Sequence, residues 1–297
     1  MLCLLPVAPP AFGHAPGEAM GDTWSFKLEV VLPLLLAVIA YAAGIRHLQG
    51  QGIRSRVIGW GRCAAFALGM SALAVALMSP LDRLAGFLFS AHMAQHLILM
   101  LVAPPLLILG RIEAVLLWTF PLPLRRLIGQ GRRKAARLRL ALDLLSRPAG
   151  VWLSASATMW FWHVSAPYAW AFYNPCIHIL EHLSFLLAFL AFWALALRPF
   201  SRDKSGHGGA LLLLILFALE SSLLGALLVF AGHPFYVVQT GQLPAFLSDI
   251  SPLQDQQLAG LMMWVPGGVA PLVALIAVFA DLLAVSQGRR LIPVGKK

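Results

Sequence analysis

The sequence predicts an all-α fold: a polytopic membrane protein built as a bundle of seven transmembrane helices, with the N-terminus outside and the C-terminus cytoplasmic. Of its 297 residues, 60% are hydrophobic and only 11% are charged, whereas soluble domains carry about 25% charged residues. Apolar runs of about 20 residues, each long enough to cross the hydrocarbon core, recur along the chain. No alternating strand pattern competes with them, so a helical bundle is favoured over a barrel.

Seven apolar runs account for the predicted spans. They are Trp24 to Tyr41, Arg62 to Ser79, Ala85 to Ala103, Val151 to Trp170, His178 to Leu197, Ala210 to Ala231 and Ala259 to Val285. Residues 24–285 would form one domain, between an extracytoplasmic tail of residues 1–23, which resembles a weak signal segment, and a basic cytoplasmic tail of residues 286–297. Pro104 and Pro105 are expected to stop or kink the third span, because proline lacks the backbone donor.

The basic residues determine the predicted orientation. Cytoplasmic loops carry the excess of Lys and Arg, and 20 of the 22 basic residues fall in or beside the loops after the first, third, fifth and seventh spans. Only Lys27 and Arg83 fall on the opposite side. The run from Arg132 to Arg139 is expected to contact anionic lipid headgroups. No nucleic-acid partner is expected, because no aromatic or base-reading residues stand among the charges.

Two histidines four residues apart, His92 and His96, lie in an otherwise apolar stretch of the third span. Residues at i and i+4 share a helix face, so both imidazoles can address one metal ion. Ionisable groups at membrane depth are costly and mark candidate functional sites. The same spacing returns in His178 and His182 at the start of the fifth span. Both pairs lie near the predicted outer ends of their helices.

Further donors fall at the same predicted depth. Imidazole suits copper, zinc, iron and nickel, thioethers favour Cu(I), and a carboxylate can ligate a metal or orient a histidine. The candidate metal ligands are His92, His96, His163, His178, His182, Met262, Met263, Glu181 and Asp255. Met78, Met93 and Met159 are further thioethers near this level, although methionine is also a common packing residue. Glu220, midway along the sixth span, is either a proton relay or a helix-helix hydrogen-bonding group.

Five blocks of the sequence together form one pattern: Ser79 to Asp82, Ser90 to Gly110, Trp160 to His163, His178 to His182 and Asp255 to Trp264. This pattern resembles the CtaG family of membrane proteins, which assist the assembly of haem-copper cytochrome c oxidases. The resemblance implies a seven-helix protein of the bacterial inner (cytoplasmic) membrane that helps to metallate the copper centre of the oxidase. Its expected partners are the oxidase subunit that carries the copper site, a periplasmic copper donor and membrane lipid.

Three function classes follow from these residues. The leading hypothesis is a copper-binding assembly factor that holds Cu(I) or Cu(II) at an outward-facing site and passes it on by ligand exchange. It is not expected to be an enzyme, because no nucleophile-base pair or phosphate loop stands out. The main alternative is a membrane cytochrome whose histidines ligate b-type haem, and the third is a copper transporter with Glu220 on its path. The one-sided distribution of the histidines disfavours the transporter.

Overall fold

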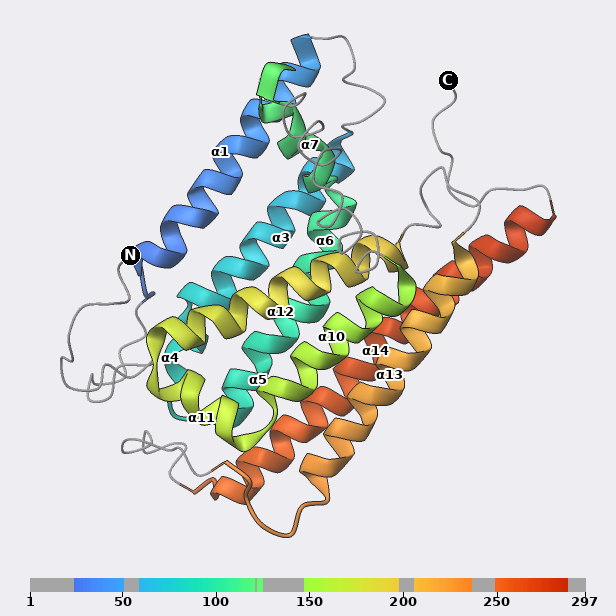
Figure 1. The fold of residues 1–297 in the computed structure, drawn as a ribbon. Helices are drawn as coiled ribbons and strands as arrows, with labels where there is room; N and C mark the ends of the chain where they lie inside the picture. The colour runs from blue at the N-terminus through green and yellow to red at the C-terminus, as the bar shows by residue number, and fades with distance from the viewer. Residues whose placement is uncertain are drawn as a thin grey trace.

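The computed structural model describes residues 24–50, 59–120, 122–124, 147–197, 206–236 and 249–287. Every regular element in these ranges is a helix (Figure 1). The elements are α1 (Leu28–Gly50), α3 (Trp60–Met78), α4 (Pro80–Leu84), α5 (Phe89–Leu97), η1 (Ile98–Val102), α6 (Ala103–Leu109), α7 (Ile112–Thr119), α10 (Pro148–Trp162), α11 (Ser165–Tyr173), α12 (Pro175–Ala196), α13 (His207–Val229) and α14 (Pro252–Ser286). The predicted tail of residues 1–23, the basic run from Arg132 to Arg139 and most of the predicted C-terminal tail lie outside the described residues.

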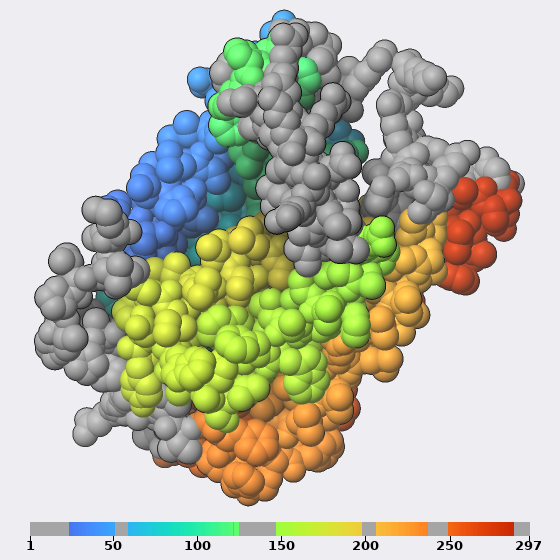
Figure 2. All heavy atoms as spheres, viewed as in Figure 1, coloured from blue at the N-terminus to red at the C-terminus, as the bar shows by residue number. Residues whose placement is uncertain are grey.

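Six helical stretches in the described residues are long and apolar enough to cross a membrane. They are Leu28–Gly50, Trp60–Leu84, Phe89–Leu109, Pro175–Ala196, His207–Val229 and Pro252–Ser286. Each overlaps one predicted span, which confirms a polytopic all-α membrane protein. The face in Figure 2 is formed largely by α10, α12 and α13, and large side chains such as Leu187 and Leu219 are exposed along these helices. An apolar outer surface of this kind suits contact with lipid.

The fourth predicted span, Val151 to Trp170, is not one continuous helix. Its residues form α10, which ends at Trp162, and the separate nine-residue helix α11. Pro167 accounts for the break, because proline fits the first turn of a helix but not its interior. Neither part has the length of the six stretches above, so the count of seven spans stays a prediction. The break leaves His163 at the end of α10, and α11 leads the chain on to α12 (Figure 1).

Pro104 and Pro105, which are predicted to stop or kink the third span, do not stop the helix, which runs beyond the predicted end at Ala103. α5 passes into the π-helical turn η1 and then into α6, which continues to Leu109. The prolines fall in the first turn of α6, where a missing N–H is tolerated. The π-helical turn directly before them rearranges the backbone hydrogen bonds, and Ala103 N–H donates to the carbonyl of Ile98. One long helical stretch therefore carries the histidine pair.

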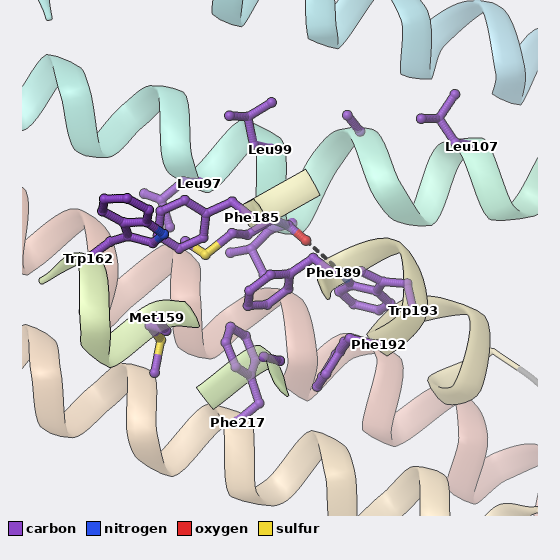
Figure 3. Close-up of a cluster of buried hydrophobic side chains, with 14 of the residues drawn as sticks. Leu97, Leu99, Leu107, Met159, Trp162, Phe185, Phe189, Phe192, Trp193 and Phe217 are labelled. Carbon is purple, nitrogen blue, oxygen red and sulfur yellow. Dashed lines mark hydrogen bonds between the residues drawn. The ribbon is translucent and has the colours of Figure 1, made fainter. Parts of the chain in front are cut away.

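Trp193 of α12 supplies the hydrogen bond that the two prolines cannot give. The carbonyl of Met100 would accept from residue 104 in an α-helix and from residue 105 in a π-helix, and both are prolines without an N–H. The indole Nε1–H of Trp193 donates to this carbonyl instead, at 2.7 Å (Figure 3). The bond ties α12 to the stretch that carries His92 and His96, one helical turn beyond His96.

Replacing Trp193 by phenylalanine keeps an aromatic ring but leaves the buried Met100 carbonyl without its donor. We expect the free energy of unfolding to fall by about 1–3 kcal/mol, which thermal unfolding of the protein in detergent can measure. Trp152→Phe is the matched control, because the Nε1 of Trp152 makes no hydrogen bond within the described residues. An equal loss in both variants would show that ring size, and not this hydrogen bond, accounts for the effect.

α13 and α14 pack closely along glycines. A Cβ added to Gly225 would meet the carbonyl oxygen of Gly260 at 2.8 Å, and one added to Gly260 would meet that of Gly225 at 2.8 Å. Small residues allow membrane helices to approach in this way. Between the same helices the Ser221 hydroxyl donates to the carbonyl of Met263 at 2.9 Å. The two helices lie side by side along most of their length (Figure 1).

Two polar contacts join helices away from the predicted outer end. The Ser156 hydroxyl of α10 donates to Oε2 of Glu220 on α13 at 2.6 Å, so this carboxylate makes a helix-helix hydrogen bond, one of its two predicted roles. His207 and Asp281, both buried, lie 3.1 Å apart between Nε2 and Oδ2 at the other end of the α13-α14 pair. These bonds satisfy polar groups that lipid cannot.

A cluster of aromatic side chains fills the centre of the bundle. Phe185, Phe189 and Phe192 of α12 are fully buried, and the last two pack against Phe217 of α13 with ring centres 5.2 and 5.1 Å apart (Figure 3). Phe185 also contacts His96, with ring centres 4.4 Å apart. His96 therefore lies directly against this apolar core.

Candidate metal centre

α5 begins at a carboxylate that comes from another helix. Leu88 at its N-cap gives no side-chain hydrogen bond. Instead Asp255 of α14 accepts from the backbone N–H of Phe89 at 2.6 Å and from that of Ser90 at 3.1 Å, and it also accepts from the Ser90 hydroxyl at 2.5 Å. A negative charge is stabilising at a helix N-terminus. This contact fixes the start of α5 and thereby the position of His92, less than one turn further on.

α12 carries three potential ligands on its first two turns. The helix begins sharply, because the Asn174 side chain accepts from two backbone N–H groups of the first turn, at 2.9 and 3.3 Å, and Pro175 occupies the first helical position. His178, Glu181 and His182 then follow at i, i+3 and i+4, which places them on one helix face. All three are buried.

The two histidine pairs meet across the contact between α5 and α12. The ring centres of His92 and His96 are 4.3 Å apart, and those of His178 and His182 are 4.1 Å apart. Across the contact, His92 lies 5.5 Å from His178 and 5.9 Å from His182, and His96 lies 5.5 Å from His182. Four imidazoles that are far apart in sequence thus form one buried cluster.

Glu181 lies within this cluster. Its Oε2 is 3.6 Å from Nε2 of His92, and its Oε1 is 3.5 Å from Nε2 of His96. The side chains of Glu181 and His92 have no exposed area, and that of His96 has 1%. The charged form of so deeply buried a carboxylate is costly, and a nearby positive charge offsets that cost. A protonated imidazole or a bound cation can supply it.

Four side chains in the cluster could hold one metal ion. His92, His178, Glu181 and His182, here called the group of four, each offer a donor atom, and these atoms lie within 4.8 Å of one another. A tetrahedral metal with bonds of about 2.1 Å holds its donor atoms about 3.4 Å apart. Small side-chain rotations would therefore bring all four to bonding distance. Imidazoles with one carboxylate suit copper, zinc or iron, so the residues fit a metal of this class.

His163 borders the cluster without joining the group of four. Its ring centre lies 6.2 Å from that of His96. Nδ1 of His163 donates to the carbonyl of Met159 at 2.6 Å, while Nε2 lies 3.2 Å from Sδ of Met93. The backbone carbonyl of His163 accepts from the hydroxyl of Tyr236 at 2.5 Å. The break after α10 thus lets this imidazole turn toward α5.

A hollow lies at the same end of the bundle. Its empty volume is about 290 Å³, open solvent included, and its lining includes Phe89, Tyr168, Tyr236 and Asp255. Tyr168 also packs edge-on against His92, with ring centres 5.4 Å apart. The ring of Tyr168 therefore lies between the hollow and His92, the first histidine of the cluster.

The comparison with protein families identifies the group to which this fold and cluster belong. A family model described as "Cytochrome c oxidase caa3 assembly factor (Caa3_CtaG)" matches residues 39–284. The chain belongs to this family. The match extends from within α1 nearly to the end of α14 and includes every residue of the cluster. It confirms the resemblance to CtaG that the sequence blocks indicate.

Two curated relatives of this chain are uncharacterized proteins of Mycobacterium bovis and Mycobacterium tuberculosis. Each is 29% identical over 255 residues, which is 81% of this chain and 36% of the relative. The chain therefore spans about a third of the length of these curated relatives. No solved structure matches the chain significantly.

The remaining predicted ligands lie apart from the group of four. Asp255 uses both carboxylate oxygens to hold the N-terminus of α5. Met263 is buried on α14 and Met262 is partly buried beside it. Within the described residues, neither of these thioethers makes a hydrogen-bonding contact with a histidine, whereas that of Met93 lies against His163. The structure thus places Met93, and not the α14 methionines, beside an imidazole.

Sequence reasoning did not single out Gln95, Tyr168 or Tyr236. Gln95 is fully buried, and its Nε2 donates to the carbonyl of Ala76 at 2.7 Å and to Oδ1 of Asp82 at 3.2 Å, which ties α5 to α3 and α4. A polar residue directly before His96 in an apolar helix was a signal that could have found it. Nothing in the sequence distinguishes the two tyrosines from other aromatic residues near helix ends.

Proposed function

We propose that this member of the caa3 assembly factor family binds copper in the cluster and assists its delivery to the copper centre of a cytochrome c oxidase. The observation that carries the proposal is the group of four: buried donors from two helices, whose ligating atoms lie within 4.8 Å of one another. Family membership supports the oxidase as the partner. The chemistry of the donors supports copper as the cargo.

The residues suit a cargo that must be released. In this proposal His92, His178 and His182 bind copper through their imidazoles, and Glu181 balances its charge. The donor atoms are spaced more widely than in a closed metal cage, so the ion would be held by few strong bonds. His96, with its ring centre 4.3 Å from that of His92, offers a further imidazole for stepwise ligand exchange. The chain acts here as a carrier and not as an enzyme.

The location of the cluster agrees with delivery on the outer side of the bacterial inner membrane. It lies where α5 and α12 begin, the end that the distribution of basic residues predicts to face outward. A periplasmic copper donor would reach it from there, past the hollow beside Tyr168. The apolar outer surface of the helices would be covered by membrane lipid, and the oxidase subunit with the copper site would dock at the same end.

Elemental analysis with an optical spectrum tests this proposal. Protein purified in detergent is measured before and after anaerobic loading with Cu(I). We expect a colourless protein that takes up copper. A Soret band with stoichiometric iron would contradict the proposal, because it would make the chain a cytochrome with the histidines as haem ligands.

Replacing Glu181 by glutamine is expected to weaken copper binding about 10- to 100-fold, the range found when a group that supports metal ligands is removed. The side chain keeps its shape but loses the charge that compensates a bound cation. Glu220→Gln is the matched control, because Glu220 is also a carboxylate between membrane helices but bonds to Ser156. Competition with a Cu(I)-binding dye measures both affinities. If Glu181→Gln and Glu220→Gln bind Cu(I) with equal affinity, Glu181 is not part of the copper site.

A further inference from the structure

Met93 and His163 lie against each other beside the cluster, and the group of four uses neither. Sδ of Met93 on α5 is 3.2 Å from Nε2 of His163 at the end of α10. Both residues are buried, with exposed fractions of 1% and 8%. We propose that this pair forms a second metal site, a thioether-imidazole site that is selective for Cu(I).

The hydrogen bonds around His163 leave both facing atoms as electron-pair donors. The carbonyl of Met159 can only accept, so its 2.6 Å contact with Nδ1 of His163 places a proton on Nδ1. In the neutral imidazole, Nε2 then carries a lone pair. The thioether of Met93 has no hydrogen to donate. Two lone pairs therefore face each other without a hydrogen between them, and a cation bound by both atoms would stabilise this arrangement.

The chemistry of the pair selects monovalent copper. A thioether is a soft, uncharged ligand, and together with one imidazole it favours Cu(I) over Zn(II). Within the described residues, neither Sδ of Met93 nor the ring of His163 makes a hydrogen bond or ion pair with a carboxylate. An uncharged pair in a buried position suits a monovalent ion better than a divalent one. The group of four differs, because it contains the carboxylate of Glu181.

His96 stands between the two sites. Its ring centre lies 4.3 Å from that of His92 and 6.2 Å from that of His163. Cu(I) can therefore pass from the group of four to Met93 and His163 by exchanging one ligand at a time. The oxidation state does not change, so the step needs no reductant. This relay rests on the proposed function, since the group of four must hold copper, whereas the second site rests on its own geometry.

X-ray absorption spectroscopy of the full-length protein in detergent, loaded anaerobically with Cu(I), tests the second site. The method separates sulfur neighbours of copper from nitrogen and oxygen neighbours. The test variant is Met93→Leu, a substitution that conserves volume. Met159→Leu is the matched control, because Met159 contacts the His163 imidazole through its backbone carbonyl. Met263→Leu examines the thioether that the sequence predicts as a ligand.

We expect a copper-sulfur signal in the native protein and in the Met159→Leu and Met263→Leu variants. In Met93→Leu the signal should disappear and the copper content should fall by about one ion per chain. A sulfur signal that survives Met93→Leu, or its absence from copper-loaded native protein, would overturn the second site and leave the proposed function standing. If copper uptake is lost in Met93→Leu but unchanged in Glu181→Gln, copper binds at the second site and not at the group of four. No copper uptake at all would overturn both.

Discussion

Replacing both His92 and His96 by alanine is expected to abolish copper binding at the group of four and to leave the oxidase short of copper. The substitutions remove one of the three imidazoles of that group and the imidazole proposed for ligand exchange. They also leave Glu181 without the two Nε2 atoms that lie 3.6 and 3.5 Å from its carboxylate. The measurements are copper per chain in the purified variant and copper per oxidase in membranes of cells that carry it.

His233→Ala provides the control for this double variant. His233 is exposed and follows α13, and its ring contacts Phe235 with centres 5.3 Å apart. We expect this variant to retain native copper binding and native oxidase. An oxidase with its full copper content in cells that contain only the double variant would contradict the proposed function, provided that the variant is present in the membrane at native levels.

Replacing Asp255 by alanine is expected to have the largest effect on stability. The substitution removes the acceptor of three hydrogen bonds and the negative charge at the buried N-terminus of α5. Bonds to a charged acceptor are worth about 1.5–3 kcal/mol each, and the two backbone N–H groups would stay buried without a partner. We therefore expect a loss of about 3 kcal/mol or more in the free energy of unfolding, measured by thermal unfolding in detergent.

The same substitution separates two roles for this carboxylate. If Asp255 positions α5, copper affinity should fall together with stability, and Asp255→Asn, which keeps one acceptor oxygen, should lie between the native protein and Asp255→Ala in both measurements. If Asp255 ligates the metal, as the sequence alone allows, copper binding would be lost while the unfolding temperature stays near its native value. That second result would contradict the role that the hydrogen bonds indicate.

The membrane fold and the two histidine pairs could be predicted from the sequence because both are local signals. Hydropathy over about 20 residues reports a membrane helix directly, and six of the seven predicted spans overlap helices of sufficient length. A spacing of four residues places two histidines on one helix face whatever surrounds the helix. The pairing of His92 and His96 with His178 and His182 then required only that the two helices be neighbours.

The remaining features depend on neighbours that the sequence does not reveal. Pro104 and Pro105 signal a helix end, and the helix continues because Trp193, which is distant in sequence, satisfies the carbonyl that they leave open. The fourth span reads as one apolar run, although a new helix begins within it at Ser165, with Pro167 in its first turn. At both sites hydropathy is uniform along the chain and gives no sign of what the helix does. Whether the helix continues or breaks depends on the backbone hydrogen bonds beside the prolines.

The sequence also could not predict which thioethers and carboxylates lie beside the histidines. Met93 and Met263 have the same chemistry and a similar predicted depth, and only the folded structure places the first against His163 at the end of α10. Asp255 and Glu181 are both carboxylates near the same end of the bundle. One faces backbone N–H groups, the other faces imidazoles, and this difference follows from the three-dimensional packing of α14 and α12 around α5.

The most direct test of the central claim is to locate copper in the protein by anomalous X-ray scattering at the copper absorption edge, from crystals grown with Cu(I). We predict an anomalous peak between α5 and α12, within bonding distance of imidazole nitrogens of His92, His178 and His182 and beside the carboxylate of Glu181. A peak confined to the α14 methionines, or a haem between the helices in place of copper, would contradict the account.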